Sequence, residues 1–327
     1  MNRIIAVVTL IISIIAGLAY LSSGPAYGGT DACYSSLLLP KLSDYNIFKG
    51  DPQSLIPGNG FQLYELATGL FTDYAEKQRL IKLPAGTTIT AVNDGLPQFP
   101  DGTILVKTFY YFNDKRDPAK GKRLIETRLL IKNNNQWVAG TYVWNQEQSE
   151  ATLATNGSNT PVNWIDEKAV TRKISYRIPA ARDCASCHNA NNTIMPIGLK
   201  VRNLNIAVVR NGSSINQLQY LHETGVMNDM NPQQFSALPA WQNEKYSIQD
   251  RVRAYLDVNC AHCHSDPGSC ARSAVRFAWE MSLAATGITE KNKRIVSLMT
   301  KGRMPRTGTT IVDSAALALI KQYFQLQ

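Results

Sequence analysis

Histidine and cysteine are scarce in this sequence, and several other features are absent from it. Its 327 residues include four His and six Cys, with no internal repeat and no low-complexity tract. No run of Lys or Arg resembles a nucleic-acid-binding tail, although the formal net charge is +9, so no nucleic-acid partner is expected. A hydrophobic content of 44% and a charged content of 18% are ordinary for a folded protein and exclude extensive disorder. The length allows two domains.

One long apolar run is present, at the N-terminus. Residues 4–21 carry no charge and follow Arg3, and Ala26, Tyr27 and Gly28 offer a small-x-small cleavage site. This order is typical of a secretory signal, so we predict that residues 1–28 are a signal peptide and that the protein is periplasmic or otherwise exported. The run is close to the length of a bilayer span, and an uncleaved N-terminal anchor stays open as the only membrane contact.

Two pentapeptides hold most of the scarce residues: CASCH at 184–188 and CAHCH at 260–264. In such a motif two thiols three positions apart add to the two vinyl groups of a haem, and the adjacent histidine binds the iron. We therefore predict two covalently bound haem c groups, with His188 and His264 as iron ligands. The predicted attachment residues are Cys184, Cys187, Cys260 and Cys263. A zinc site would need further ligands, and outside the motifs only His222 remains.

Two cysteines lie outside the motifs. They are Cys33 and Cys270. In an oxidising compartment such a pair tends to form a disulfide, which would join the mature N-terminus to the C-terminal part of the chain. Two buried free thiols are the alternative.

The residue pattern changes from β to helical along the chain. Runs rich in Val, Ile, Thr, Tyr, Phe and Trp, separated by turn-forming clusters, predict strands at 87–92, 103–112, 123–132, 136–145 and 170–178. The Asn triplet at 133–135 predicts a hairpin. Apolar spacing predicts helices at 213–225, 247–259, 290–300 and 313–324, and a short helix is expected within 61–79.

These patterns predict an α+β multidomain protein. An antiparallel β-sheet domain at 31–195 would end in the first haem motif, and a helical linker region at 196–245 would follow it. An all-α domain at 246–327 would hold the second motif.

The C-terminal segment resembles a class I cytochrome c domain. The matching features are a helix that ends in CAHCH, a helix leading into the loop at 302–308, and a closing helix. The resemblance implies that Met304 is the sixth iron ligand opposite His264, and His/Met ligation suits electron relay; a core methionine is the alternative. Lys301, Arg303 and Arg306 surround this loop and would attract acidic redox partners, unless they are merely solvated.

The sixth ligand of the first haem stays open in the sequence. His222, Met195, Met227 and Met230 all lie between the motifs, and an open iron is a further possibility. His262 lies inside the second motif and is interpreted as a spacer. The first motif follows a β stretch without a long helix, which excludes class I architecture around His188.

Residues 60–195 resemble the cytochrome c-prime-beta group, whose lysine-cross-linked relatives oxidise hydroxylamine. The resemblance rests on the run at 99–107, the β hairpins and the closing CxxCH motif. It implies that Lys107 bonds to the first haem, and Glu126 in the next strand is the nearest candidate for the relatives' pocket carboxylate. Strand alternation places Lys107 on the apolar face of Leu105, Phe109 and Tyr111, although an edge lysine whose ammonium reaches solvent is the alternative.

The order of parts also resembles a family of bacterial periplasmic di-haem c-type cytochromes. Shared phrases occur at 124–132, 196–198, 202–205 and 259–264. The leading hypothesis is electron transfer between redox protein partners. The alternative is an oxidoreductase or gas-binding protein with an open haem at His188 and the second haem as electron relay. A di-haem peroxidase is a third hypothesis, against which the β-domain counts.

Overall fold

The structure, a computed structural model, describes residues 37–228 and 231–326. The predicted signal peptide, Cys33 of the predicted disulfide and the candidate ligand Met230 lie outside the described residues. Residues Pro40–Gln327 form one compact unit, and the following description concerns this unit.

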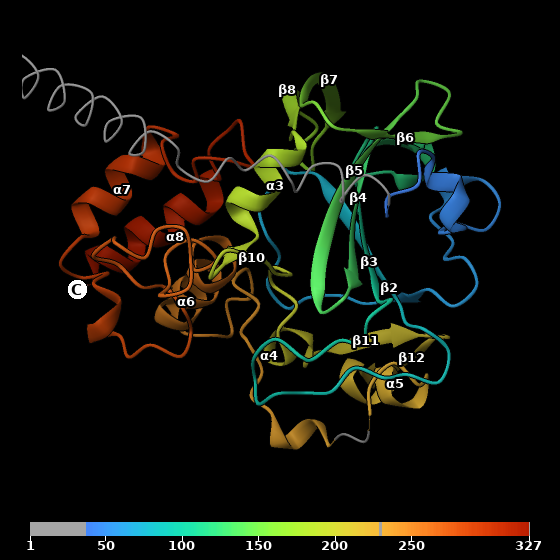
Figure 1. Ribbon diagram of the computed structural model, residues 1–327. Coiled ribbons are helices and arrows are strands. Elements are labelled where there is room, and N and C mark those ends of the chain that lie inside the picture. Colours follow the sequence, from blue (N-terminus) through green and yellow to red (C-terminus); the bar gives the residue numbers. More distant parts are fainter. Residues whose placement is uncertain (1–36, 229–230, 327) are drawn as a thin grey trace, which may run out of the picture. The chain divides into compact units, whose positions relative to one another are not determined.

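A six-stranded antiparallel sheet forms the centre of the unit, with its strands side by side in sequence order (Figure 1). The strands are β1 (Gln62–Leu63), β2 (Glu76–Lys82), β3 (Ile104–Phe112), β4 (Lys122–Asn133), β5 (Gln136–Trp144) and β6 (Ala151–Ala154). The predicted β4–β5 hairpin is confirmed. Its turn residues Asn134 and Asn135 have φ values of 48° and 59°, which Asn tolerates and which match the twist of the flanking strands.

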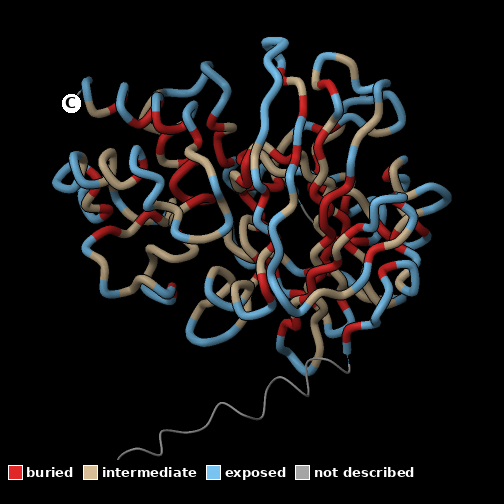
Figure 2. The backbone as a smooth tube through the Cα atoms, turned by 90° about the horizontal axis from the view of Figure 1, so that it is seen from above, coloured by how far each residue is buried: buried red, intermediate tan, exposed pale blue. Residues whose placement is uncertain are grey.

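The two faces of the sheet pack against different parts of the chain. Val106 of β3 lies in a buried cluster with Leu42 and Ile47 from the first 3-10 helix and the residues after it. Leu105, one position earlier, packs in another cluster with Leu218. This alternation is that of a strand buried on both faces. Figure 2 shows the buried positions following the strands and helices, with exposed positions gathered in the connections.

A second hairpin and a short helix carry the first motif. Strands β7 (Ser158–Ile165) and β8 (Thr171–Ile178) pair with each other, and α3 (Ala181–Cys187) contains both cysteines of the motif. The two-residue strands β9 (Asn189–Ala190) and β10 (Thr193–Ile194) follow. Helix α3 and β10 both contact β5, so the first motif lies against the sheet.

The region at 196–245 mixes short helices with a hairpin. It holds α4 (Val201–Leu204), β11 (Ala207–Arg210), β12 (Ser213–Asn216) and α5 (Gln217–Glu223). The helix expected at 213–225 begins only at Gln217, because the Asn216 side chain accepts hydrogen bonds from the first free backbone amides. Five 3-10 helices complete the described part: Leu42–Tyr45, Pro52–Ser54, Pro118–Lys120, Pro232–Gln234 and Ala284–Thr286.

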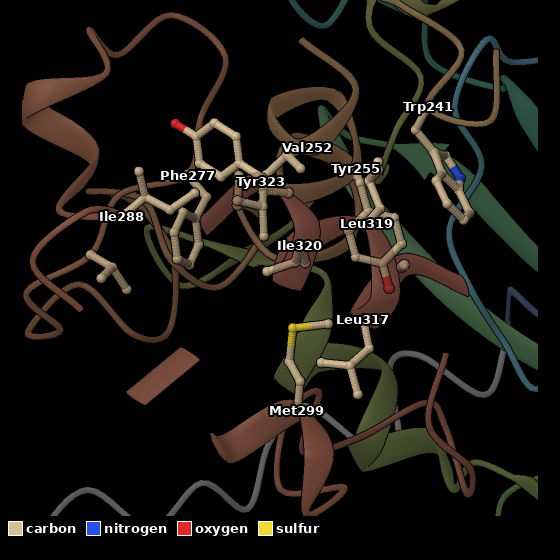
Figure 3. Close-up of a cluster of buried hydrophobic side chains, with 14 residues drawn as sticks. Trp241, Val252, Tyr255, Phe277, Ile288, Met299, Leu317, Leu319, Ile320 and Tyr323 are labelled. Atoms are coloured by element: carbon tan, nitrogen blue, oxygen red, sulfur yellow. The ribbon is translucent and has the colours of Figure 1, made fainter. Parts of the chain in front are cut away.

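Three helices lie in the C-terminal segment, and they agree closely with the predicted ranges. They are α6 (Ile248–Asn259), α7 (Asn292–Thr300) and α8 (Ser314–Gln325). Ser247 caps α6 and Asp313 caps α8 through side-chain oxygens that accept backbone N–H groups. The helices share a buried cluster in which Val252, Ile320 and Tyr323 take part (Figure 3).

The expected all-α class I cytochrome c domain at 246–327 is wrong. The described part of the chain is mostly antiparallel β with six α-helices of 4 to 12 residues, and between α6 and α7 the chain is largely turns. The physical reason is that this segment is bonded into the rest of the unit. Asp257 of α6 forms a buried ion pair with Arg202, at 3.3 Å, and Asn259 accepts a hydrogen bond from the backbone of Phe71, at 2.7 Å.

Two local predictions are also wrong. Residues 61–79 form β1, a loop and the start of β2 instead of a helix. Residues 87–92 make only isolated bridges, from Ile89 to Met227 and from Thr90 to Gln98, instead of a strand. Within the described ranges, no helix combines the length and the apolar character that crossing a membrane requires.

Candidate haem sites

The two CxxCH motifs adopt the same backbone turn. The N–H of His188 donates to the carbonyl of Cys184, and the N–H of His264 donates to the carbonyl of Cys260, both at 2.9 Å. Side chains three and four positions apart in such a turn lie on one side of it, so two thiols and an imidazole face the same space. All four motif cysteines are free and half-buried. The two cysteines of the first motif lie in α3 and the second motif follows the end of α6, and haem attachment at both stays a prediction.

The imidazole of His188 is held in one orientation. Its Nδ1 lies 2.8 Å from the carbonyl oxygen of Met195, which can only accept, so Nδ1 carries the proton and Nε2 presents its lone pair. Burial, with a smaller contribution from the charge of Lys107, lowers the pKa of His188 to about 3. A neutral imidazole whose second nitrogen is bonded to a carbonyl is the usual form of a metal-ligating histidine.

The same hydrogen bond defines the position of Met195. Its carbonyl accepts from Nδ1, and its own backbone N–H donates to the carbonyl of His188 at 2.7 Å. The Met195 backbone therefore lies behind the imidazole, on the side away from Nε2. Its side chain packs at the edge of a buried cluster.

A cavity that is partly open to solvent lies beside His188. Its volume is about 110 Å³. Strands β3, β4 and β5 form one wall, and α3 supplies Cys184, Cys187 and His188. The residues present thus fit a haem at the first motif, because two free thiols and an oriented imidazole border a cavity that is partly open to solvent.

Lys107 lines this cavity together with His188, on the face that strand alternation predicted. Its ammonium lies 5.3 Å from the centre of the Phe109 ring. Burial, followed by repulsion from Arg128 and Arg79, lowers the pKa of Lys107 to about 7. A bond from Lys107 to a haem stays a prediction.

Glu126 is fully buried, and its carboxylate is already engaged. One oxygen accepts from Nε of Arg128 at 3.0 Å, and the other accepts from the Tyr176 hydroxyl at 2.7 Å. Burial alone would lower the pKa of the Arg128 guanidinium. The nearby Glu126 carboxylate outweighs this effect and raises that pKa above its usual value. The candidate carboxylate therefore positions Arg128, which lines the cavity.

The second motif has a different surrounding. Among the described residues, the buried Nδ1 of His264 has no hydrogen-bond partner, and the His264 ring packs edge-on against Phe277 at 5.5 Å. Burial, followed by the charge of Arg276, lowers the pKa of His264. The two thiols and the neutral imidazole fit haem attachment, but no carbonyl orients this ring as Met195 orients His188.

Met304 lies half-buried in the connection between α7 and α8. The residues that follow it reach the first motif: Pro305 and Thr307 line the cavity beside His188, and the Thr307 hydroxyl lies 2.8 Å from the Cys187 sulfur. Asp73 fastens the end of this loop by accepting from the backbone N–H of Thr310 at 2.8 Å. Lys301, Arg303 and Arg306 are all exposed, as the interpretation as a partner surface requires.

The other candidate ligands lie elsewhere. His222 is exposed on α5, with Nδ1 3.4 Å from the carbonyl of Met227, and it does not line the cavity. Met227 is buried in the cluster beneath the sheet. Sequence reasoning missed Arg79, Arg128 and His262, which do line the cavity. The sequence feature that could have identified His262 is an imidazole at a spacer position of the second motif. For Arg128 it is an arginine on the apolar face of a predicted strand.

The two motifs are neighbours in space. The backbone N–H of Asn191 donates to the carbonyl of Pro267 at 2.9 Å, and Ala190 forms a β-bridge with Gly268. A Cβ atom at Gly268 would clash with the carbonyl of Cys263, so glycine permits the tight turn that brings this segment back. The segment that follows His188 therefore contacts the segment that follows His264.

No family model, curated protein or solved structure matches this chain. Among the described residues, no three His, Cys, Asp or Glu side chains are arranged to hold a bare metal ion. A haem iron needs only axial ligands from the protein.

Proposed function

We propose that this protein is an exported di-haem c-type cytochrome that transfers electrons between redox partners. Cys184, Cys187 and His188 would hold one haem, and the second motif at 260–264 would hold the other. When bound, each haem supplies a one-electron Fe(III)/Fe(II) couple. The predicted signal peptide supports a periplasmic or otherwise exported location, where such attachment takes place.

The contact between the two motifs carries this proposal. Residues 189–191 follow His188 directly, residues 267–268 lie three and four positions after His264, and the two segments are joined by a hydrogen bond and a β-bridge. Electron tunnelling slows steeply with distance, so sites joined in this way favour direct exchange. The chain itself contributes neutral imidazoles, a fixed separation and an apolar helical cluster that excludes water from one side of the second motif.

The exposed cations of the 301–306 loop support docking of acidic partners. Lys301, Arg303 and Arg306 lie close together in sequence on the loop whose later residues border the first cavity. Positive charge there would speed the encounter with a negatively charged electron carrier.

A second candidate function has an observation of its own. The cavity beside His188 is partly open to solvent, and Lys107 and Arg128 line it. These features favour an oxidoreductase or gas-binding protein that works at an open haem on His188, with the second haem as electron relay.

Spectroscopy of the purified exported protein separates the two functions. Intact-mass measurement should find two covalent haems, and a mass without them contradicts the proposal. For a pure electron carrier, the haem at His188 is low-spin in both oxidation states and does not react with carbon monoxide. A high-spin signal at that haem that is lost on addition of carbon monoxide would establish the second function instead.

A further inference from the structure

Three cationic side chains form a row across the wall of the cavity. Arg79 on β2 is the direct cross-strand neighbour of Lys107 on β3, and Lys107 is the direct neighbour of Arg128 on β4. All three line the cavity beside His188. Direct neighbours on one face have Cβ atoms about 5 Å apart, and like charges in that position repel each other.

Only one member of the row has a carboxylate partner. Arg128 is paired with Glu126, whereas the side chains of Arg79 and Lys107 make no hydrogen bond or ion pair with any residue that the structure describes. Burial lowers the pKa of both. The row thus holds unbalanced positive charge in a partly buried place, which is costly unless an anion joins it.

The nearest acidic residues are occupied elsewhere. Glu65 pairs with Arg210 at 2.9 Å, and Glu76 pairs with Lys115 at 2.8 Å. A third carboxylate, Asp183, lines the same cavity but pairs with Arg177 at 3.2 Å. Each of these carboxylates therefore already has a partner, and among the described residues none is paired directly with Arg79 or Lys107.

We propose that Arg79 and Lys107 form a binding site for a carboxylate in the cavity beside His188. The Phe109 ring forms cation–π contacts with two of the three cations, because the Lys107 ammonium and the Arg128 guanidinium lie 5.3 Å and 4.5 Å from its centre. Guanidinium and ammonium groups fit a carboxylate through charge-assisted hydrogen bonds.

The carboxylate that binds here has two possible sources. One is a propionate of the haem that the proposed function places at Cys184 and Cys187, and on this source the inference rests on that function. The other is a small carboxylate from solution, for which formate is the probe. The second source does not depend on the proposed function.

The test compares the holoprotein with Arg79→Gln, Lys107→Gln and Lys107→Arg. Arg177→Gln is the matched control, because Arg177 lines the same cavity but already has a carboxylate partner. Thermal melting and intact mass first establish that each variant is folded and which haems it carries. Isothermal titration with formate and resonance Raman spectra of the propionate groups are then recorded.

If the haem is the source, both Gln variants shift the propionate vibrations of the first haem, Lys107→Arg does not, and formate does not bind. If a solution carboxylate is the source, formate binds the wild type, roughly tenfold weaker in either Gln variant, and Arg177→Gln is unchanged. The inference is overturned if formate does not bind and the propionate vibrations are the same in all variants. Formate binding to a protein without haem would retain the inference and reject the proposed function.

Discussion

The two CxxCH motifs share one backbone turn, but their surroundings differ. His188 is oriented by the Met195 carbonyl and faces a cavity with a row of cations. His264 has no such partner and packs against Phe277 beside an apolar cluster of helices. Two pentapeptides with the same CxxCH pattern thus offer the same candidate attachment residues, while their surroundings decide what an attached group could do. Charge and space favour ligand chemistry at the first motif, and apolar packing favours electron relay at the second.

Removing attachment thiols tests whether the two motifs are independent. We expect Cys184→Ser with Cys187→Ser to remove the first haem, and Cys260→Ser with Cys263→Ser to remove the second, because each haem is bonded only to its own pair. Intact mass should fall by one haem in each case. Cys270→Ser is the control and should retain both. Loss of both haems from either double variant would mean that the motifs depend on each other for folding.

Replacing Met304 with alanine tests which of the two predicted haems this residue binds. We expect Met304→Ala to alter the absorption and lower the reduction potential of the haem at His264 only, because His/Met ligation raises the potential. Potentiometry followed by absorption measures both haems. A change confined to the haem at His188 would reassign Met304, since Pro305 and Thr307 line that cavity.

His262 reaches from the second motif into the cavity of the first. Burial lowers the pKa of His262 to about 4, against the opposing effect of a hydrogen bond to the Val258 backbone, so the imidazole is neutral. We expect His262→Ala to change the electron paramagnetic resonance signal of the haem at His188 and to leave the other unchanged. His222→Ala, on the exposed surface of α5, is the matched control. Identical signals for both variants would show that His262 does not affect the haem at His188 and is only a spacer in its motif.

Local sequence signals predicted those elements whose causes are local. The caps Ser247 and Asp313 start helices within a residue of the expected positions, and the Asn triplet forms its hairpin. The helix expected within 61–79 does not form, because its last residues, Glu76 to Arg79, begin β2 instead. Their strand conformation depends on pairing with β3, a segment distant in the sequence, so residues 61–79 alone do not reveal it.

The candidate site was predicted in part for the same reason. CxxCH spacing predicts attachment thiols and iron-binding histidines, which stay predictions, and strand alternation places Lys107 on the face that lines the cavity. The contacts that shape the site join distant segments, such as Asp73 with Thr310 and Thr307 with Cys187. These long-range bonds also explain why no separate all-α domain forms at 246–327.

Glu126→Gln tests how strongly the first site depends on its buried ion pair. The variant leaves the Arg128 guanidinium without its counter-charge, and we expect the free energy of unfolding to fall by about 3 kcal/mol in urea titration. Asp257→Asn removes the buried partner of Arg202 next to the second motif and should cost a similar amount. Glu65→Gln removes a carboxylate that is about half exposed from its pair with Arg210, and should cost less than about 1 kcal/mol. Equal effects from Glu126→Gln and Glu65→Gln would show that the row of cations does not need this carboxylate.

Neutralising the exposed loop gives the smallest expected change, and it tests which site meets the partner. We expect Lys301→Gln, Arg303→Gln and Arg306→Gln together to slow association with an acidic electron carrier roughly tenfold at low ionic strength, and to have little effect at high salt. Stopped-flow reduction over a series of salt concentrations measures this rate. The charge reversal Lys245→Glu, at an exposed position before α6, is the control for net charge alone. If both variants slow association equally, overall charge attracts the partner; if only the loop variant does, electrons enter where the loop borders both motifs.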